Sequence, residues 1–426
     1  MSVTLSDKDK RMLDGEYGAA ARLAMSILVR MAEVYGAEEM MDVTQAHIDG
    51  VGLLSEAGLE FAETLAALGG KVSIPTTLNM VPLDIQQWEE LGIPEDYAQK
   101  ALRQIKAYTD MGCIPTCTCA PYQGYLTPRF GQQIAWAESN AIVYANSVLG
   151  ARTNRYGDYI DICAAITGRV PKYGLHLKQN RRGQILLRLV DLTPEVLHDD
   201  TFYPVLGYFI GRVAEDKIPV IEGLPPEATS DQLKAMGAAA ASSGAVGLFH
   251  AVGLTPEAHT LEEAFQGAAP EMVIDVGPAD LREAQAALST AEAGADLDAV
   301  VLGCPHFSFA EFQQLTQLVL AAKGRSVHSA VRFIILTNQL TYSLLQRSDL
   351  LESLTKFGIE IVLDTCDFHC PILSPHVKTI MTNSGKQAYY APGELGVQVA
   401  FGSLADCVKS AIEGRVYQGE MLWTGL

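Results

Sequence analysis

The sequence predicts an α/β protein with a mainly helical first part, followed by βαβ units with largely parallel sheets. In the first part, long helix-like segments begin near proline and end at glycine, as helices commonly do. From about Lys217, short apolar runs alternate with helical segments, which is typical of parallel sheets. The 426 residues can form two or three domains. We therefore expect an N-terminal part over residues 1–215 and an α/β part over 216–426.

The positions of proline and glycine define the expected elements of the first part. We expect one short strand, Lys71 to Ile74, which enters the polar loop 75–79. The expected helices are Asp7 to Tyr35 before Gly36, Glu56 to Leu68 before Gly69, Pro94 toward Met111, and Gly131 to Leu149 before Gly150.

The second part contains eight strand candidates and one clear helix start. Ser308 and Glu311 have the spacing of a capping box, in which each side chain satisfies a free amide at the helix start. The expected strands are Ile218 to Ile221, Gly247 to Ala251, Met272 to Val276, Ala299 to Leu302, Phe333 to Leu336, Ile359 to Leu363, Thr379 to Met381 and Val397 to Phe401.

The composition excludes some classes of partner. With 31 basic and 50 acidic residues, the net charge is -19, which argues against binding to nucleic acid or to anionic membranes. The first residues are polar, and no stretch reaches the roughly 18 apolar residues of a membrane span. We expect a cytoplasmic protein that binds a small molecule or another protein.

Three of the eight cysteines lie where a ligand site is expected. Cys304 and Cys366 directly follow strand-like runs, and open α/β sheets bind ligands at the carboxyl ends of their strands. With Cys119, they supply three thiolates that could hold iron and sulfide. Long chains in reducing compartments use cysteine for metal binding, catalysis or burial rather than disulfides. Cys163 and Cys407 lie in apolar helical segments and are expected in the core.

Other residues near these loops have two possible roles. Cys113, Cys117 and Cys119 have neither the zinc-ribbon nor the ferredoxin spacing. Cys113, Cys117 and Cys370 can be ligands or buried thiols. If only three cysteines bind, one iron lacks a thiolate and can act as a Lewis acid. Three histidines near the loops are expected to be structural: His306, His369 and His376.

Polar residues interrupt an apolar helical segment between Trp136 and Gly150. Such residues are poor choices for a packed interior unless they cap, pair or contact a ligand; the alternative is a solvated face. The segment contains Glu138, Ser139, Asn140, Asn146 and Ser147. The following stretch, Arg152 to Arg182, has seven basic and two acidic residues, which suits either an anionic substrate or internal ion pairing.

A strand followed by a polar loop occurs again near the end of the chain. Asn383, Ser384, Gly385 and Lys386 can present a hydroxyl, backbone amides and an ammonium to an anion. The loop lacks the Walker A pattern. A simple surface turn is the alternative.

Taken together, these motifs resemble the large subunit of aconitase X, over essentially the whole chain. The motifs are residues 13–18, 46–50, 118–122, 136–141, 146–155, 303–306 and 382–386. The resemblance implies an aconitase-like fold, an iron-sulfur cluster and dehydration of a hydroxylated acid. Members of the family act on cis-3-hydroxy-L-proline, giving Δ1-pyrroline-2-carboxylate, or on mevalonate 5-phosphate.

The resemblance also implies roles for residues. The implied cluster ligands are Cys119, Cys304 and Cys366, and the cluster can be [2Fe-2S], [3Fe-4S] or [4Fe-4S]. The implied catalytic candidates are Glu138, Ser384 and Lys386, although the base can also come from a second subunit. The implied substrate-binding residues are His47, Asn79, Ser139, Asn140, Asn146, Ser147, Arg152 and Arg155.

The resemblance leaves the substrate and partners as expectations. The chain ends soon after its last strand and helix, so we expect the family's swivelling domain on a separate small subunit. A phosphate favours more cationic side chains than Lys386 and the 152–182 stretch provide, so we favour cis-3-hydroxy-L-proline over mevalonate 5-phosphate. A non-catalytic iron-sulfur or thiol redox sensor is the alternative outside enzymes, because Cys113, Cys117 and Cys119 are crowded.

Overall fold

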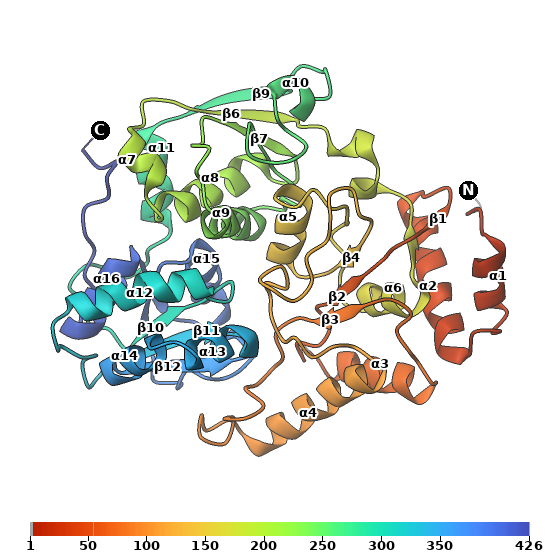
Figure 1. Cartoon of the computed structure of the whole chain (residues 1–426), viewed down its shortest axis with the longest axis horizontal. Coiled ribbons are helices and arrows are strands. Elements are labelled where there is room, and N and C mark those ends of the chain that lie inside the picture. Colours follow the sequence, from red (N-terminus) through yellow and green to blue (C-terminus); the bar gives the residue numbers. More distant parts are fainter. Residues whose placement is uncertain (1–2, 54, 426) are drawn as a thin grey trace. The chain divides into compact units, whose positions relative to one another are not determined.

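The computed structural model describes residues 3–53 and 55–425, which form two compact units (Figure 1). Unit 1 comprises Met1–Arg182 and Asp364–Cys370, and unit 2 comprises Gly183–Leu363 and Pro371–Leu426. The sequence analysis expected a boundary after residue 215. The division after Arg182 arises because β6, Ile185–Leu189, pairs with β7 and β9 of unit 2.

Unit 1 contains a three-stranded parallel sheet in the order β3-β2-β4 and an antiparallel pair, β1-β5. Its strands are β1 Met40–Asp42, β2 Ala46–Ile48, β3 Thr76–Leu78, β4 Ala135–Trp136 and β5 Arg169–Pro171. Its helices are α1 Asp7–Leu13, α2 Ala19–Tyr35, α3 Glu56–Ala67, α4 Glu95–Asp110, α5 Ser139–Ser147 and α6 Ile160–Thr167, with 3-10 turns at Gly174–His176 and Lys178–Arg181.

Unit 2 contains two parallel sheets. The four-stranded sheet has the order β8-β7-β6-β9, and the five-stranded sheet has the order β12-β11-β10-β13-β14. The remaining strands are β7 Pro219–Glu222, β8 His250–Ala251, β9 Met272–Val276, β10 Ala299–Leu302, β11 Arg332–Thr337, β12 Ile359–Leu363, β13 Thr379–Thr382 and β14 Gln398–Phe401.

The helices of unit 2 connect these parallel strands, as crossover connections require. They are α7 Pro194–His198, α8 Phe202–Ala214, α9 Ser230–Ser243, α10 Leu261–Ala264, α11 Pro278–Ala287, α12 Phe309–Ala321, α13 Gln339–Gln346, α14 Leu350–Phe357, α15 Gly385–Glu394 and α16 Leu404–Glu413.

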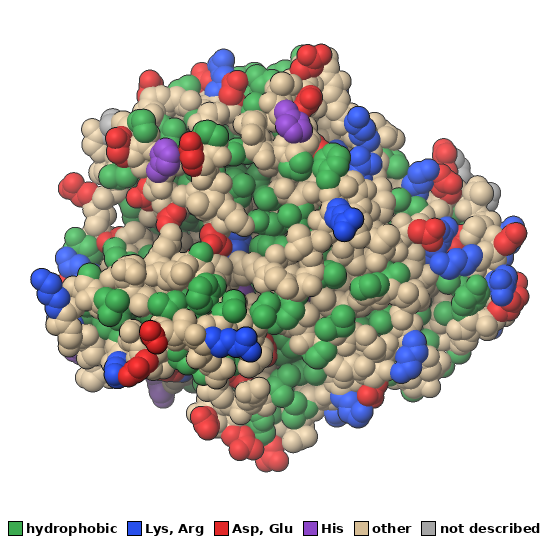
Figure 2. All heavy atoms as spheres, viewed as in Figure 1, with side chains coloured by type: hydrophobic (Ala, Val, Ile, Leu, Met, Phe, Trp, Pro, Cys, Tyr) green, Lys and Arg blue, Asp and Glu red, His purple; other side chains and the backbone are tan. Residues whose placement is uncertain are grey.

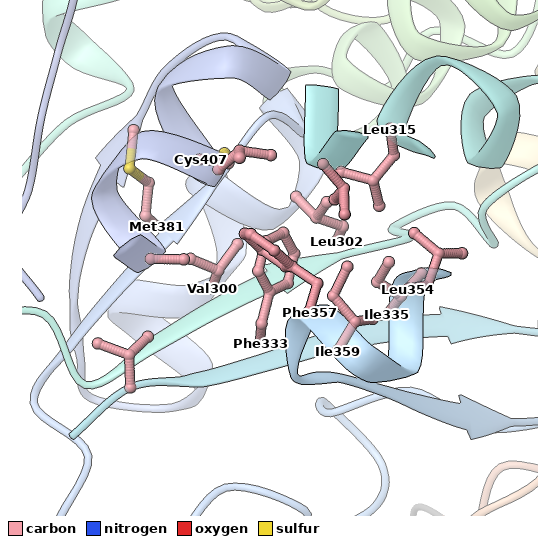
Figure 3. Close-up of a cluster of buried hydrophobic side chains, with 14 of the residues drawn as sticks. Val300, Leu302, Leu315, Phe333, Ile335, Leu354, Phe357, Ile359, Met381 and Cys407 are labelled. Carbon is pink, nitrogen blue, oxygen red and sulfur yellow. The ribbon is translucent and has the colours of Figure 1, made fainter. Parts of the chain in front are cut away.

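An apolar core stabilises the five-stranded sheet. Val300 and Leu302 of β10 and Phe333 and Ile335 of β11 pack with apolar side chains of the surrounding helices, including Phe357 (Figure 3). These strands are buried along their length and read as continuous apolar runs, as strands of parallel sheets do. The core therefore fixes the carboxyl edge of this sheet, where several candidate site residues follow the strands.

Most predicted elements are confirmed, including the parallel sheets and the Ser308–Glu311 capping box. The expected helix from Asp7 to Tyr35 is two helices, separated near Gly15 and Gly18, which both have positive φ. The strand predicted at Lys71 to Ile74 is wrong, because the strand is β3 in the polar segment that follows.

The helix predicted from Gly131 to Leu149 is also wrong in its first half. The chain there forms β4, and the helix α5 begins only at Ser139. The change of direction occurs at Glu138, which has φ 73° and caps α5. An extended residue pair and a positive φ are incompatible with a continuous helix.

Charged side chains of both signs are interspersed over the face that Figure 2 shows. None of the described helices combines the length and the hydropathy needed to cross a membrane.

Candidate active site residues in the two units

The carboxyl edge of the parallel sheet in unit 1 gathers three polar side chains. The strand register pairs His47 of β2 with Thr77 of β3 and with Trp136 of β4. Two residues further along each chain come Asp49, Asn79 and Glu138. The Asn79 amide bonds the Ile48 carbonyl and the Ala137 amide bonds the His47 carbonyl, so the three segments stay adjacent past the strand ends. The Glu138 carboxyl lies close enough to Asp49 to raise its pKa. We call Asn79, Asp49 and Glu138 the edge row.

The row below the edge row contains buried polar atoms. His47 is 0% exposed, and its Nδ1 lies 2.8 Å from Thr77 Oγ1. Burial lowers the pKa of His47 to about 4, so the ring is neutral at pH 7. Within the described chain, His47 Nε2 and Trp136 Nε1 have no hydrogen-bond partner. Such orphaned atoms are rare in buried positions and are expected near functional sites.

Asp49 is the residue of the edge row that the sequence analysis missed. Its side chain is half-buried and accepts a hydrogen bond from Asn79 Nδ2. Burial, followed by the neighbouring carboxyl of Glu138, raises the pKa of Asp49 to about 8. The sequence signal was an aspartate directly after a strand, but the three-residue strand β2 was not recognised.

Glu138 is held in one orientation by the start of α5. Its Oε2 accepts a hydrogen bond of 2.6 Å from the Ala141 amide, and its Oε1 lies 3.3 Å from Ser139 Oγ. The residue is 6% exposed. A carboxylate at a helix N-terminus is stabilised by the free amides and the helix dipole. Glu138 therefore has a fixed carboxylate beside Asp49.

Asn140 connects α5 to the Cys119 loop. Its Nδ2 donates to the Cys119 carbonyl at 2.8 Å, and its Oδ1 accepts from the Tyr122 hydroxyl at 2.9 Å. Tyr122 in turn stacks on Tyr144, with ring centroids 3.7 Å apart. In the structure, Asn140 thus positions the backbone of a predicted cluster ligand.

Cys366 belongs to unit 1 although the strand before it, β12, belongs to unit 2. The segment Asp364–Cys370 is fixed within unit 1 by a 2.8 Å hydrogen bond from the Val81 amide to the Asp364 carbonyl, and by one from the Tyr97 hydroxyl to the His369 carbonyl. Cys119 and Cys366 are therefore carried by the same compact unit.

Cys304 and Ser384 come together in unit 2. Cys304 follows β10, Ser384 follows the adjacent strand β13, and the Ser384 hydroxyl donates to the Cys304 carbonyl. Ser384 Oγ also accepts from the Gln387 amide at 3.1 Å and so caps α15. Gly303 is required here, because it has φ 94° and an added Cβ would lie 2.1 Å from the Leu336 carbonyl oxygen. Cys304 and Ser384 are thus neighbours at this edge of the sheet and line the same small cavity.

A buried lysine lies near these two residues and was not predicted. Lys234 of α9 lines a small cavity together with Cys304, Asn383 and Ser384. It is 2% exposed and forms ion pairs with Asp231 and Glu311. Burial opposes the charged form, but the two carboxylates outweigh burial and raise the pKa of Lys234. No sequence motif marked this residue, because it stands alone in an alanine-rich helix.

The other predicted site residues lie in different environments. Asn146 is buried, and its amide bonds both the Thr153 backbone amide and carbonyl at 3.0 Å. Ser147 is buried in the same helix, whereas Ser139, Arg152 and Lys386 are half-buried and Arg155 is exposed.

Part of the basic stretch serves internal pairing, one of its two predicted uses. Arg169 bonds Asp9 and Asp42, Lys172 bonds Glu39, and Arg181 bonds Asn146 and Leu175.

The eight cysteines are all free thiols, and they differ in exposure. Cys119, Cys304 and Cys366 are 7%, 8% and 8% exposed, and each of the other five is exposed by 4% or less. Burial raises the pKa of Cys370 to about 12 and also raises the pKa of Cys113, Cys117, Cys163 and Cys407. Within residues 3–53 and 55–425, no three His, Cys, Asp or Glu side chains form a metal-binding group. The ligand assignment therefore stays a prediction.

Comparison with family models covers most of the chain. The sequence matches the aconitase X first domain over residues 2–179, the second domain over 183–286 and the third domain over 297–413. The structure is similar to that of Thermococcus kodakaraensis aconitase X in its holo-form, with a TM-score of 0.85 and 31% identity over 96% of this chain and 100% of that chain.

Two groups of characterised relatives align over nearly the whole chain. A cis-3-hydroxy-L-proline dehydratase of Hypocrea jecorina is 44% identical over 419 residues, which are 97% of this chain and 69% of the relative. A phosphomevalonate dehydratase large subunit of Methanothermobacter thermautotrophicus is 38% identical over 403 residues, which are 94% of this chain and 96% of the relative. The chain therefore belongs to the aconitase X family.

Proposed function

We propose that the protein is a hydro-lyase that dehydrates cis-3-hydroxy-L-proline to Δ1-pyrroline-2-carboxylate. The observation that carries this proposal is the fixed Glu138 carboxylate in the edge row, in a chain 44% identical to a cis-3-hydroxy-L-proline dehydratase. The relatives are dehydratases of both substrate groups, which supports an enzyme rather than a redox sensor.

The three more exposed cysteines suit an iron-sulfur cluster. Thiolates are the usual protein ligands of such clusters, and a ligand must contact the cofactor, which the fully buried Cys163 and Cys407 are less able to do. Cys119, Cys304 and Cys366 would hold the cluster, with its nuclearity open. When bound, a cluster with an iron lacking a thiolate supplies a Lewis acid for departure of the hydroxyl group.

Glu138 is our candidate for the base that removes the proton from the carbon next to the carboxylate. The Ala141 amide and the Ser139 hydroxyl fix its orientation, and a positioned carboxylate is a suitable general base. The Ser384 hydroxyl instead donates its proton to the Cys304 carbonyl, so it is better placed to orient the substrate or the thiol loop. Loss of the proton and of the hydroxide gives an enamine, which tautomerises to the Δ1-pyrroline.

The substrate carboxylate needs cationic or amide donors. Lys386 in the first turn of α15 and the half-buried Arg152 are candidates, with His47, Asn79, Asn140, Asn146, Ser147 and Arg155 as further predicted contacts or supports. Asn140 and Asn146 act through their neighbours, because their amides bond Cys119 and Thr153.

Dehydration of mevalonate 5-phosphate is the second candidate. A phosphomevalonate dehydratase large subunit of Methanothermobacter is 38% identical over 94% of this chain, and its name implies a smaller partner. A separate small subunit that supplies the swivelling domain is therefore part of our proposal. We also propose a cytoplasmic location, based on the eight free thiols, which suit a reducing compartment.

The test is a comparison of both substrates with the anaerobically reconstituted protein, in the presence of the small subunit. We expect loss of water from cis-3-hydroxy-L-proline, detected by mass spectrometry. Glu138→Gln should reduce kcat by at least about a hundredfold, the usual contribution of a general base. The exposed Glu90→Gln is the matched control. Faster turnover of mevalonate 5-phosphate would favour the second candidate.

A further inference from the structure

Asp49 and Asn79 together form an acceptor-rich corner of the edge row. Asn79 uses its Nδ2 group as a donor to Asp49 Oδ1, which turns the carbonyl side of the amide away from that bond. Asn79 is 0% exposed, and among the described residues its Oδ1 has no hydrogen-bond partner. A buried amide oxygen without a donor costs free energy unless a ligand supplies one.

Further carboxyl groups lie close to this corner, and burial together with their mutual repulsion raises the pKa of Asp49 to about 8 and that of Asp161 to about 7. Glu138, Asp158 and Asp161 all act electrostatically on Asp49. Asp161 is 0% exposed and accepts hydrogen bonds from the Asp49 and Gly50 amides at 2.7 and 3.2 Å. A cation that enters the corner lowers the pKa of these carboxyl groups and is attracted by their charged forms, whereas a phosphate is repelled by them.

A secondary ammonium group supplies the positive charge and the N–H donors that the corner lacks. It carries one positive charge and two N–H groups, which can donate hydrogen bonds to two neighbouring acceptors. Asn79 bonds Asp49 directly, and the Glu138 carboxyl is close enough to raise the pKa of Asp49, so a group bound at Asp49 has Glu138 as a neighbour. In cyclic amino acids of this kind, the ring nitrogen is bonded to the carbon from which Glu138 would remove a proton.

We propose that Asp49, positioned by Asn79, binds the ring ammonium of the substrate and thereby selects a cyclic amino acid over a phosphorylated hydroxy acid. This inference rests on the proposed function for the identity of the substrate. The recognition itself is a binding property, so it can be tested without turnover.

The experiment measures calorimetric binding of two ligands of the same shape to the full chain. L-Proline carries the ring ammonium, and tetrahydrofuran-2-carboxylate has an oxygen in its place. We expect wild-type protein to bind L-proline at least about tenfold more tightly, the effect of a charge-assisted hydrogen bond. Asp49→Asn should bind the two ligands nearly equally, with its affinity for tetrahydrofuran-2-carboxylate unchanged. Asp49→Ser serves the same purpose if the asparagine variant does not fold.

Asp96→Asn is the control, because it removes an exposed carboxyl group that is not part of this corner. It should keep the preference for L-proline. The inference is overturned if wild-type protein shows no preference or binds neither ligand, if Asp49→Asn keeps the preference, or if Asp96→Asn loses it equally. If the preference for L-proline is observed but cis-3-hydroxy-L-proline is not turned over, the proposed reaction is refuted and the inference about Asp49 stands.

Discussion

Asp49 and Glu138 each lie two residues beyond the register pair His47–Trp136, just past the ends of two neighbouring parallel strands of unit 1. The two carboxyl groups have different surroundings. Glu138 receives an amide hydrogen bond at the start of α5, whereas burial favours the neutral form of Asp49. Two adjacent carboxyl groups whose environments differ in this way are typical of acid–base sites.

The raised pKa of Asp49 predicts a pH dependence of stability. Its pKa of about 8 in the folded chain lies above the ordinary value of 3.8, so the unfolded chain loses this proton first as the pH rises. Folding stability therefore falls between about pH 4 and pH 8. Asp49→Asn removes this loss and should gain about 1–3 kcal/mol over wild type at pH 8.5, but little at pH 4.

Thermal unfolding at several pH values measures this difference. The exposed Asp96→Asn is the control, and its difference from wild type should stay constant with pH. The other groups acting on Asp49 are Glu138, Asp158 and Asp161, which remain in both proteins. A gain for Asp49→Asn that is largest at low pH would contradict the assignment.

Removing single cysteines should separate cluster ligands from buried thiols. Cys119→Ala, Cys304→Ala and Cys366→Ala should each lose most of the bound iron and the visible absorption after anaerobic reconstitution. Cys163→Ala and Cys407→Ala are matched controls in helices α6 and α16 and should retain both. Iron content that is unchanged in any of the first three variants removes that cysteine from the ligand set.

Asn140→Ala should destabilise unit 1 because it leaves two buried groups without their partner. The Cys119 carbonyl and the Tyr122 hydroxyl both lose a hydrogen bond, which predicts a loss of about 2–4 kcal/mol. Tyr122→Phe removes only the second bond and should cost about 1 kcal/mol. Denaturant unfolding measures both values. Equal losses in the two variants would show that the bond to Cys119 contributes little.

Lys234→Met should cost about 3–5 kcal/mol, because it leaves Asp231 and Glu311 without their buried cation. A second change, Glu311→Gln, should recover part of this loss in the double variant. Lys217→Met removes an exposed ion pair with Glu271 and should cost less than about 1 kcal/mol. Similar losses for Lys217→Met and Lys234→Met would mean that the buried pair is not strongly coupled.

The sequence predicted unit 2 better than unit 1, for a physical reason. The strands β10 and β12 are four and five residues long, fully or mostly apolar, and separated by helices with clear caps. The strands β2, β3 and β4 have only two or three residues, all buried, and they include polar residues such as His47 and Thr77. Such short strands have no visible alternation, so their hydrogen bonding depends on distant partners.

The site was predictable where chemistry marks a residue and not where packing decides its role. Cysteine at a strand end and glutamate before a helix are recognisable in the sequence, and the structure places Cys304 and Glu138 in those positions. Asp49 and Lys234 were missed because an isolated charged residue is normally exposed. Only the folded chain shows that neighbouring acids surround them both.

Because the segment Asp364–Cys370 belongs to unit 1, this unit is discontinuous in the amino-acid sequence. A fragment that stops at Arg182 would leave the Val81 amide and the Tyr97 hydroxyl without their carbonyl acceptors and would omit Cys366. The amino-terminal unit can therefore complete its own architecture only after ribosomes have translated the chain as far as Cys370.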